Sequence, residues 1–540
     1  MPISDSESPR LCNRPLGLAR SVLILATCLL GTAAPADQRA QYDAVRAKSI
    51  IELQPFRSET SANLPGSDAK VRLISLNPAV NSWFVLQIGK TGAAQKYYHI
   101  ENPNPRGQKI ALASGPALKL SGGGGTVTCA PWANPSELAT AAASRRPFAP
   151  ICGGRLYLRN PVAGSTLSVA RGAPSGGAAS AGGPPAASIA ASGNRPAITA
   201  QTGLGLSGTK PGQMTMGAWH PVAGLTGVFA SAIQPRAISK SILQGPGTVN
   251  ALDGVELGQT VYMVAFDLSR YDLGFAVGTN DPNLKWSPRP PASVRAPGLP
   301  GPDGVGSPAP LAPLGMVSPN LAGRTVATFA GGFKRRQGAF KYGPYAAVNG
   351  GSHYGFIEQG VIFSKLQPGL STLYVTTNGQ IQMKTWTKSD NGQLSKIRFA
   401  RQNGVPLIEG GVPGRYVTQW GPGNWSGSAE AKLRTLRAGA CMLGSGSKSY
   451  LAYAYFPSAT PSAMTRTFQA YGCKYAMLLD MNAPVLTYLA LYVNSGGTTY
   501  IEHLVPQMAT SDKRGGAGVV PKFLGTTDSR DMFYIMRKGR

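Results

Sequence analysis

Short apolar runs separated by turn signals dominate the C-terminal half of the sequence. Residues 261–268 and 474–479 are apolar over most of their length, as in strands buried on both faces. Asn378-Gly379 lies between two such runs and is the strongest short-range hairpin signal in the chain. Gly355 to Phe363 predicts a second hairpin. The pattern predicts an α+β fold, strand-rich and mixed with few helices, over residues 245–540.

One helix is readable, directly before the run at 474–479. Thr460 is a suitable N-cap, Pro461 fits the first helical position, and Gly472 ends the helix. The chain then enters a strand that ends at Asp480. Because α/β proteins often place chemistry at the carboxyl ends of strands, Asp480 is the first candidate functional residue. The predicted apolar face of the helix consists of Met464, Phe468 and Tyr471.

The N-terminal half has a different pattern. Residues 37–165 contain short strand-like runs and predict a small β-rich module. From Ala173 to Ala200, 23 of 28 residues are Ala, Gly, Pro or Ser, which predicts a disordered linker that we place at residues 166–244. Residues 287–319 contain ten prolines and predict a surface insertion into the C-terminal domain.

The first 36 residues resemble a signal peptide. Arg10, Arg14 and Arg20 precede an uncharged stretch with an apolar centre, and Ala34-Pro35-Ala36 offers small residues for cleavage. The stretch is shorter than the roughly 20 apolar residues of a spanning helix. We therefore predict a secreted or periplasmic protein with no transmembrane span after cleavage. A retained membrane anchor is the alternative interpretation.

Cysteine usage agrees with export to an oxidising compartment. Cleavage leaves Cys129, Cys152, Cys441 and Cys473, which could pair in three ways. Their spacing favours one bridge between the first two residues and one between the last two. None of these cysteines has Cys-x-x-Cys spacing and the chain has only 4 His, so we predict no metal site and name no cofactor.

The chain is strongly basic, with 52 Lys and Arg against 24 Asp and Glu and a formal net charge of +28. Such a charge favours anionic partners, namely lipid head groups, phosphorylated glycans or nucleic acid. The alternative is that the charge only maintains solubility. No nucleic-acid-binding motif is present, so we predict no nucleic-acid partner. The sequence also lacks the motifs of serine hydrolases, P-loop enzymes and zinc proteases.

Six segments follow one another in the C-terminal half: Phe266–Leu268, Phe329–Phe333, His353–Gly360, Arg401–Gly411, Arg437–Ala440, and the helix and strand that end at Asp480. Together and in this order they resemble the phosphodiester glycosidase domain family. Two positions depart from that pattern: Ala330 stands where the family has Asn, and Met481-Asn482 replaces a glycine loop after Asp480. The resemblance covers a little over half of the chain.

The resemblance implies a hydrolase that cleaves a sugar-1-phosphodiester or a related envelope glycan linkage. Its partner would be an anionic glycan or a sugar-phosphate substrate. Asp480 would act as acid/base or as a ligand of substrate hydroxyls, Glu409 would be the second carboxylate, and Arg437 would hold the anionic group. The alternatives are a strand-end carboxylate that caps a turn, a solvated glutamate and a structural ion pair. The implied substrate-binding residues are Gly331, Gly332, Phe333, His353, Tyr354 and Asn482.

If Ala330 and Met481-Asn482 abolish the activity, the chain would keep the fold of the family but have a different function. That protein would be a catalytically inactive, anionic-glycan-binding envelope protein. Turnover of a phosphodiester substrate distinguishes the two hypotheses.

Overall fold

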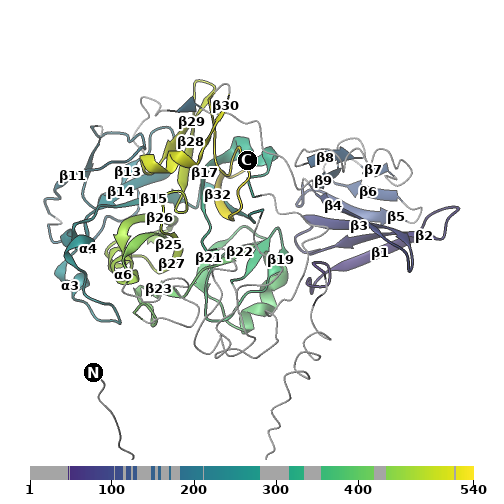
Figure 1. Ribbon diagram of the computed structural model, residues 1–540, viewed down its shortest axis with the longest axis horizontal. Coiled ribbons are helices and arrows are strands. Elements are labelled where there is room, and N and C mark those ends of the chain that lie inside the picture. The colour runs from purple at the N-terminus through teal and green to yellow at the C-terminus, as the bar shows by residue number, and fades with distance from the viewer. Residues whose placement is uncertain are drawn as a thin grey trace, which may run out of the picture.

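The computed structural model describes most of the chain from residue 47 onward (Figure 1). Within this part the protein is strand-rich with few helices, as the sequence predicts. The described residues are 47, 49–102, 104–113, 117–122, 126–129, 148–151, 156–159, 170–171, 183–191, 193–210, 212–279, 315–333, 354–418, 433–515 and 518–539.

Three sheets form the C-terminal body. One has the order β13 (His220–Pro221), β14 (Val228–Ile233), β15 (Val261–Asp267), β26 (Lys448–Ala459), β25 (Thr435–Ser445), β27 (Tyr475–Met481), β23 (Pro406–Glu409), β24 (Val412–Pro413). The second has the order β10 (Ala170–Arg171), β29 (Thr498–His503), β28 (Leu489–Ser495), β17 (Thr325–Ala330), β32 (Met532–Arg537), β16 (Tyr271–Ala276). The third has the order β19 (Val361–Ser364), β18 (Phe356–Glu358), β22 (Ile397–Gln402), β20 (Ser371–Thr376), β21 (Ile381–Thr385).

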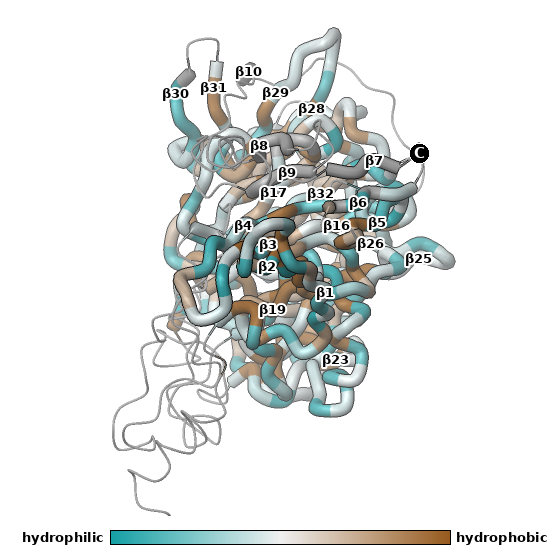
Figure 2. The backbone as a smooth tube through the Cα atoms, turned by 90° about the vertical axis from the view of Figure 1, so that its right-hand side faces the viewer, coloured by the Kyte–Doolittle hydropathy of each residue, from teal (hydrophilic) through white to brown (hydrophobic). Residues whose placement is uncertain are grey.

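The strands predicted as continuous apolar runs lie inside this body. Every residue of β15 and of β27 is buried, because other elements cover both faces of each strand. Figure 2 shows apolar stretches following the strands and hydrophilic residues at many of the turns. The two predicted hairpins are confirmed as β18–β19 and β20–β21.

The helices are short and few within the described residues. The predicted helix is confirmed as α6 (Pro461–Ala470), and the Thr460 hydroxyl accepts a hydrogen bond from the Ala463 N–H at its N-cap. None of the helices in this part of the chain is long and apolar enough to cross a membrane. The others are α3 (Lys240–Leu243), α4 (Gly254–Gly258) and the 3-10 helices η2 (Pro235–Ala237), η4 (Pro319–Arg324), η5 (Ser389–Lys396) and η6 (Pro506–Ser511).

Smaller strands complete the structure. The N-terminal sheet has the order β1 (Ser58–Asn63), β2 (Ala69–Ser75), β3 (Trp83–Lys90), β4 (Lys96–Glu101), β9 (Leu156–Arg159), β8 (Phe148–Ile151). Beside it lie β5 (Lys109–Ala113), β6 (Ala117–Ser121) and β7 (Thr126–Cys129). Two further pairs are β11 (Ala197–Thr199) with β12 (Gln213–Thr215), and β30 (Lys513–Gly515) with β31 (Gly518–Val520).

The N-terminal sheet packs against the C-terminal body. Alternate residues of β3 face two cores: Phe84 joins a small core of the module, whereas Trp83 joins the main core. The Gln54 side chain donates to the Ile362 carbonyl oxygen (2.8 Å) and accepts from the Ile362 N–H (2.8 Å). The module is therefore fixed to the body through the β18–β19 hairpin.

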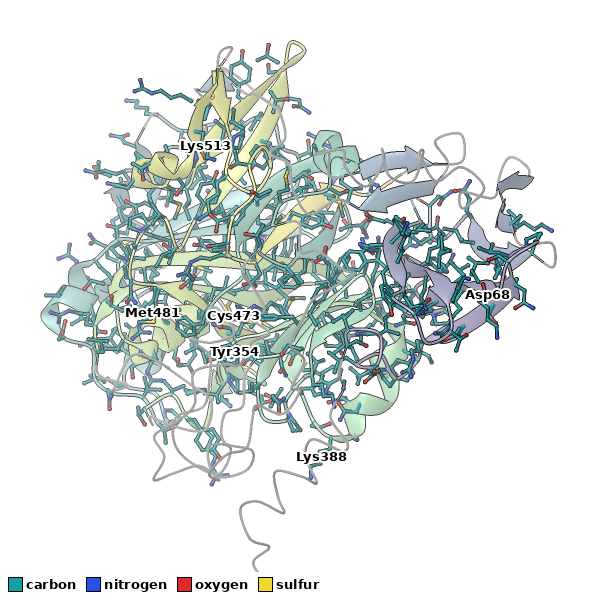
Figure 3. All side chains as sticks on the ribbon, turned by 45° about the vertical axis from the view of Figure 1, so that its right-hand side comes forward. Asp68, Tyr354, Lys388, Cys473, Met481 and Lys513 are labelled. Carbon is teal, nitrogen blue, oxygen red and sulfur yellow. A yellow bond between two sulfur atoms is a disulfide. The ribbon has the colours of Figure 1, made fainter. Side chains whose placement is uncertain are left out.

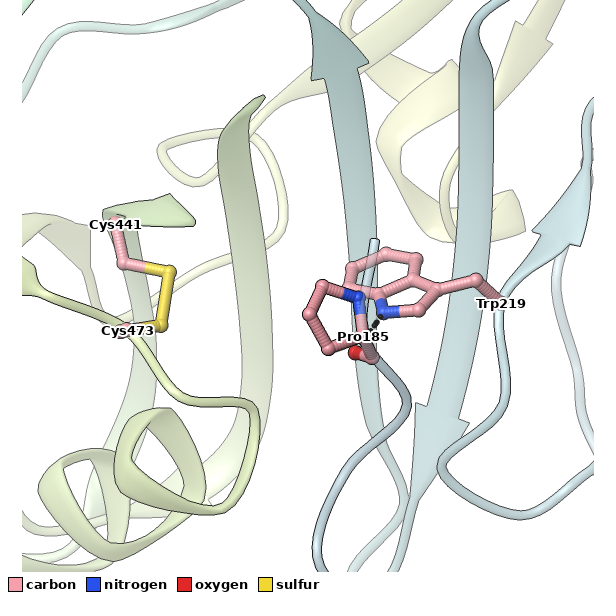
Figure 4. The surroundings of a disulfide bond; sticks show 4 residues. All are labelled: Pro185, Trp219, Cys441 and Cys473. Atoms are coloured by element: carbon pink, nitrogen blue, oxygen red, sulfur yellow. Dashed lines mark hydrogen bonds between the residues drawn. A yellow bond between two sulfur atoms is a disulfide. The ribbon is translucent and has the colours of Figure 1, made fainter. Parts of the chain in front are cut away.

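The predicted linker is wrong over residues 183–244. Apart from residues 192 and 211 this segment is described and folded, and β14 is wholly buried between β13 and β15. The Trp219 indole N–H donates to the Pro185 carbonyl oxygen (2.9 Å; Figure 4). The Ala- and Gly-rich composition ends near residue 200, and the apolar residues that follow supply core side chains that the linker interpretation ignored. Within 166–182 the described residues are 170 and 171, which form β10 and pair with β29.

Several other predictions fall on residues that the structure does not describe. The signal peptide at 1–36 and Cys152 lie outside the described residues, as do the side chain of Cys129 and most of the insertion at 287–319. The predicted Cys441–Cys473 bridge is confirmed (Figure 4). It joins β25 to the turn that follows α6.

Removal of this bridge should destabilise the protein measurably. The two cysteines are 32 residues apart, and a closed loop of that length lowers the entropy of the unfolded chain by an amount worth about 3–4 kcal/mol. We expect the double variant Cys441→Ala/Cys473→Ala to lose that much free energy of unfolding in urea titrations. Reduced wild-type protein is the matched control and should lose a similar amount. A loss below about 1 kcal/mol would contradict the entropic argument.

Candidate functional site

Three of the segments that carry the family resemblance meet in the body. They are Gly331–Phe333, which follows β17, Arg401–Asn403 at the end of β22, and Asp480 near the end of β27. Two labels in Figure 3 mark this site: Tyr354 lies beside Arg401, and Met481 follows Asp480. Because the three segments belong to three different sheets, the site forms only when the body is assembled.

Asn403 holds the three segments together. Its side-chain oxygen accepts from the Phe333 N–H (3.1 Å), and its amide nitrogen donates to the carbonyl oxygens of Leu478 (2.8 Å) and Leu479 (2.9 Å). Gly332 has φ +136°, and a Cβ there would lie 2.8 Å from the Asn403 side chain. A glycine is therefore required for this close approach.

A buried ion pair lies beside Asn403. Arg401 Nε is 2.7 Å from Asp531 Oδ2, and both side chains are fully buried. The guanidinium stacks on the Phe356 ring, 4.4 Å from its centroid, and also donates to the Phe333 carbonyl oxygen. The Gly331 N–H donates to the Asp531 carbonyl oxygen (3.0 Å). The pair thus connects the end of β22 to the residue before β32.

Asp480 is a buried carboxyl group with an unusual protonation equilibrium. Its Oδ2 lies 2.5 Å from Arg530 Nη1, and its Oδ1 accepts from the Met481 N–H (2.9 Å). The pKa of Asp480 is raised to about 7, chiefly by burial and to a smaller extent by the nearby Asp531 carboxylate. The Arg530 and Arg401 cations and the Met481 N–H act in the opposite direction. The group therefore exchanges a proton close to neutral pH.

A third ion pair completes the charged cluster. Lys522 Nζ lies 3.5 Å from Asp528 Oδ2 and donates to the Val485 carbonyl oxygen (2.8 Å). Burial lowers the pKa of Lys522, although the carboxylates of Asp528 and Asp480 oppose this effect. The cluster contains three cations and three carboxyl groups, so it carries a net charge of +1 when Asp480 holds a proton. Its members are Arg401, Lys522, Arg530, Asp480, Asp528 and Asp531.

Glu409 lies at the opposite end of β27 from Asp480. It is exposed at the end of β23, pairs with Tyr475 and accepts from the Thr385 hydroxyl (2.6 Å). Tyr475 and Asp480 are five positions apart along β27, which is about 17 Å at the rise of an extended strand. Paired carboxylates in glycosidases are about 5–9.5 Å apart. The structure therefore does not bring Glu409 and Asp480 together.

Arg437 lies next to the site but directs its guanidinium into the protein. It pairs with Met481 across β25 and β27 and is fully buried. Its Nε donates to the Ala459 carbonyl oxygen (2.8 Å) and its Nη2 to the Leu433 carbonyl oxygen (2.8 Å). Burial lowers the pKa of Arg437 to about 10, opposed by the Glu256 carboxylate. This arrangement braces the ends of β25 and β26.

A lysine at position 437 should destabilise the fold. The guanidinium satisfies two carbonyl oxygens at once, and an ammonium on a longer stem has a different donor geometry. We expect Arg437→Lys to lower the free energy of unfolding by about 1–3 kcal/mol, measured by thermal and urea unfolding. If substrate binding weakens while stability stays unchanged, Arg437 contacts the substrate instead.

The remaining predicted residues differ in exposure. Tyr354 is buried, its ring stacks on Phe333 at 6.4 Å, and burial raises the pKa of its hydroxyl. Asn482 is exposed, has φ +80° and accepts from the Thr435 hydroxyl (3.1 Å). His353 lies outside the described residues. No group of three or more potential metal ligands occurs in the part of the chain that the structure describes.

Sequence reasoning did not select four charged members of the cluster: Lys522, Asp528, Arg530 and Asp531. Arg401 and Asn403 stood in a segment quoted for the resemblance but were not chosen. One signal could have found Arg530 and Asp531: Asp528, Arg530 and Asp531 are three charges directly before the apolar strand 532–536. Binding and catalytic residues are often found in the loops next to such strands.

Comparison with known proteins gives resemblance at the level of solved structures. No family model and no curated protein matches the sequence. The structure resembles the zebrafish N-acetylglucosamine-1-phosphodiester alpha-N-acetylglucosaminidase catalytic domain, auto-inhibited by pro-peptide. The TM-score is 0.30 and the sequence identity is 9%, and the match covers 67% of this chain and 96% of that one.

Two bacterial structures also match. A hypothetical protein from Synechocystis has a TM-score of 0.28 and 10% identity over 89% of this chain and 97% of its own. A Burkholderia pseudomallei protein named as an exported protein has a TM-score of 0.25 and 10% identity over 89% of this chain and 96% of its own.

Proposed function

We propose that this chain is an exported hydrolase that cleaves a sugar-1-phosphodiester or a related glycan linkage, with Asp480 as the general acid. The observation that carries the proposal is the buried Asp480 carboxyl group within the cluster of three ion pairs. A carboxyl group with a pKa of about 7 holds a proton at neutral pH for part of the time and can donate it to a leaving oxygen.

The charge of the cluster suits a phosphodiester. With Asp480 protonated, three cations face the two carboxylates of Asp528 and Asp531, so the cluster has a net charge of +1. A phosphodiester is a monoanion, and its binding neutralises that charge. Arg530 is the member best placed to contact it, because its side chain is 11% exposed while the Arg401 side chain is fully buried.

The carboxyl group that tunes Asp480 in this proposal is Asp531, whose side chain is fully buried and does not contact the substrate. It acts electrostatically on Asp480 and is held by Arg401. Glu409 is too distant from Asp480 for that role, and Arg437 supports the strand ends beside the site. Asn403 holds the Gly331–Phe333 turn beside the cluster.

Hydrolysis by the purified chain tests the proposal. The substrates are aryl and sugar-1-phosphodiesters, offered with and without divalent metal ions, and the product is the released alcohol or sugar. Turnover that saturates with substrate supports a phosphodiester glycosidase. Release of phosphate from monoesters with no action on diesters would contradict it.

A non-catalytic function has its own support. The Asp480 carboxyl group is only 2% exposed and already bonded to Arg530 and to the Met481 N–H. A protein that binds an anionic glycan without turnover would retain the basic surface and need no accessible acid. Saturable binding of an anionic glycan that weakens with salt, together with no product from any diester, would favour this second function.

A further inference from the structure

A basic cleft lies between the N-terminal sheet and the C-terminal body. Its volume is about 790 Å³, within the range of small-ligand sites. Its walls come from the turn after β4, the tip of the β20–β21 hairpin, η4, β22 and the end of β32. Because the two parts of the protein each supply a wall, the cleft depends on the packing of the module against the body.

Cations dominate the lining. Among the described residues that line the cleft, Arg106, Arg324, Arg398 and Lys538 are basic and Asp272 is the one acid. Four positive charges against one negative charge leave a net +3. Such an excess in a concave surface attracts and concentrates anions.

Two of the arginines are held in place by the protein. Arg324 donates through Nη2 to the Arg537 carbonyl oxygen (2.6 Å), and the same nitrogen lies 3.8 Å from Asp272 Oδ2. Arg398 Nε donates to the Gln359 side-chain oxygen (3.1 Å). Burial and the Arg106 cation lower the pKa of Arg398, opposed by Tyr534, Asp272 and Glu101.

Arg106 is presented by a rigid turn. The Asn81 side chain donates to the carbonyl oxygens of Pro105 (2.8 Å) and Gln108 (2.6 Å), on both sides of Arg106. Asn81 itself has φ +56°, a conformation that the two bonds stabilise. Arg106 Nη2 lies 3.5 Å from the position that a Cβ would take at Gly379, on the hairpin opposite. The guanidinium therefore spans the cleft toward the body.

We propose that this cleft binds a ligand that carries two or more phosphate groups. One phosphate group would neutralise only part of a net +3, and the volume exceeds what one phosphate fills. Arginine guanidinium groups bind phosphate oxygens in a bidentate manner, and three of the four cations are arginines. A phosphorylated glycan and free polyphosphate share this chemistry.

The cleft is separate from the Asp480 cluster. The two places share no residue, although Arg398 of the cleft and Arg401 of the cluster are three positions apart on β22, about 10 Å along the strand and on opposite faces of it. The proposal does not rest on the proposed function, because binding at the cleft needs no catalytic group.

Titration calorimetry of the purified chain tests the proposal with three probes: tripolyphosphate, a phosphorylated oligosaccharide and a neutral oligosaccharide. We expect the first two to bind and the third not to bind. In the variant Arg106→Gln/Lys538→Gln we expect Kd for the phosphate probes to rise about tenfold or more. Both side chains are exposed, so the variant should unfold at the wild-type temperature.

A matched control separates the cleft from general charge. Lys210→Gln/Arg236→Gln removes the same charge at exposed positions that do not line the cleft and should leave Kd within about twofold. An equal loss in both variants, or no binding of either phosphate probe at low salt, would overturn the proposal. So would equally tight binding of a phosphate-free polyuronate.

The tighter of the two phosphate probes identifies the source of the ligand. Hydrolysis of a small aryl phosphodiester should be the same in both variants.

Discussion

We expect Asp480→Asn to lower kcat/KM for phosphodiester hydrolysis by about 10²–10⁴ while the melting temperature stays close to that of the wild type. Like the protonated carboxyl group, the asparagine has one carbonyl oxygen, which can accept from Arg530 or from the Met481 N–H, so one of the two local bonds survives. It has no acidic proton to give to the leaving oxygen. Steady-state kinetics and thermal unfolding of the same preparation measure both effects.

The pH dependence gives an independent readout of the same residue. Because the pKa of Asp480 is raised to about 7, the acid form is lost above neutral pH, and wild-type kcat/KM should fall there. The same shift affects stability. The folded pKa lies above the unfolded value of 3.8, so this group's contribution to stability is complete below about pH 4 and is lost as the pH rises through about 7. The asparagine variant should lack this pH dependence of stability.

Glu409→Gln is the matched control, because it neutralises the other carboxylate that the sequence analysis selected. Its side chain is exposed and about 17 Å along the strand from Asp480. We expect its kcat/KM and its pH profile to equal those of the wild type. Reversed results, with Glu409→Gln inactive and Asp480→Asn active, would refute the assignment of the general acid. An unfolded Asp480→Asn protein would show a structural role instead.

Arg401→Met should cost about 3–5 kcal/mol of unfolding free energy, the largest stability effect that we expect of a single substitution. The substitution leaves the Asp531 carboxylate buried without its cation, and it removes the stacking on Phe356 and the bond to the Phe333 carbonyl oxygen. Chemical denaturation measures the loss. Activity should fall with it, since the Gly331–Phe333 turn loses one of its anchors.

A double-mutant cycle isolates the ion pair from the other contacts of Arg401. In Arg401→Met/Asp531→Asn the uncompensated charge is gone, so the double variant should be more stable than Arg401→Met alone. If the double variant loses the sum of the two single losses, the two side chains act independently. That outcome would contradict the coupling inferred from their 2.7 Å contact.

The local elements were readable from the sequence because their signals are local. The N-cap Thr460 and the terminator Gly472 define α6, and Asn378-Gly379 defines the β20–β21 hairpin. The apolar run at 474–479 is long enough to predict a buried strand, and the structure confirms it as β27. The placement of Asp480 at the end of that strand follows from the same pattern.

The cluster around Asp480 was less readable because its members are far apart in sequence. Arg401 contacts Asp531 across 130 residues, and Arg530 contacts Asp480 across 50. One sequence shows no such pairings, so Glu409 was chosen for its position after an apolar run. The linker prediction over 183–244 failed for another reason: composition was averaged over a segment whose later part contains the buried strand β14.

The pairing of β16 with β32 has a consequence for how the protein folds. Tyr271 lies opposite Arg537, and within its sheet β16 is hydrogen-bonded to β32 and to no other described strand. A contact between residues 271 and 537 requires closure of a very long loop, and such non-local pairing slows folding. Until β32 is available, the neighbouring edges of β16 and β17 stay open and can associate with other chains. Refolding should therefore be slow, and its yield should fall as protein concentration rises.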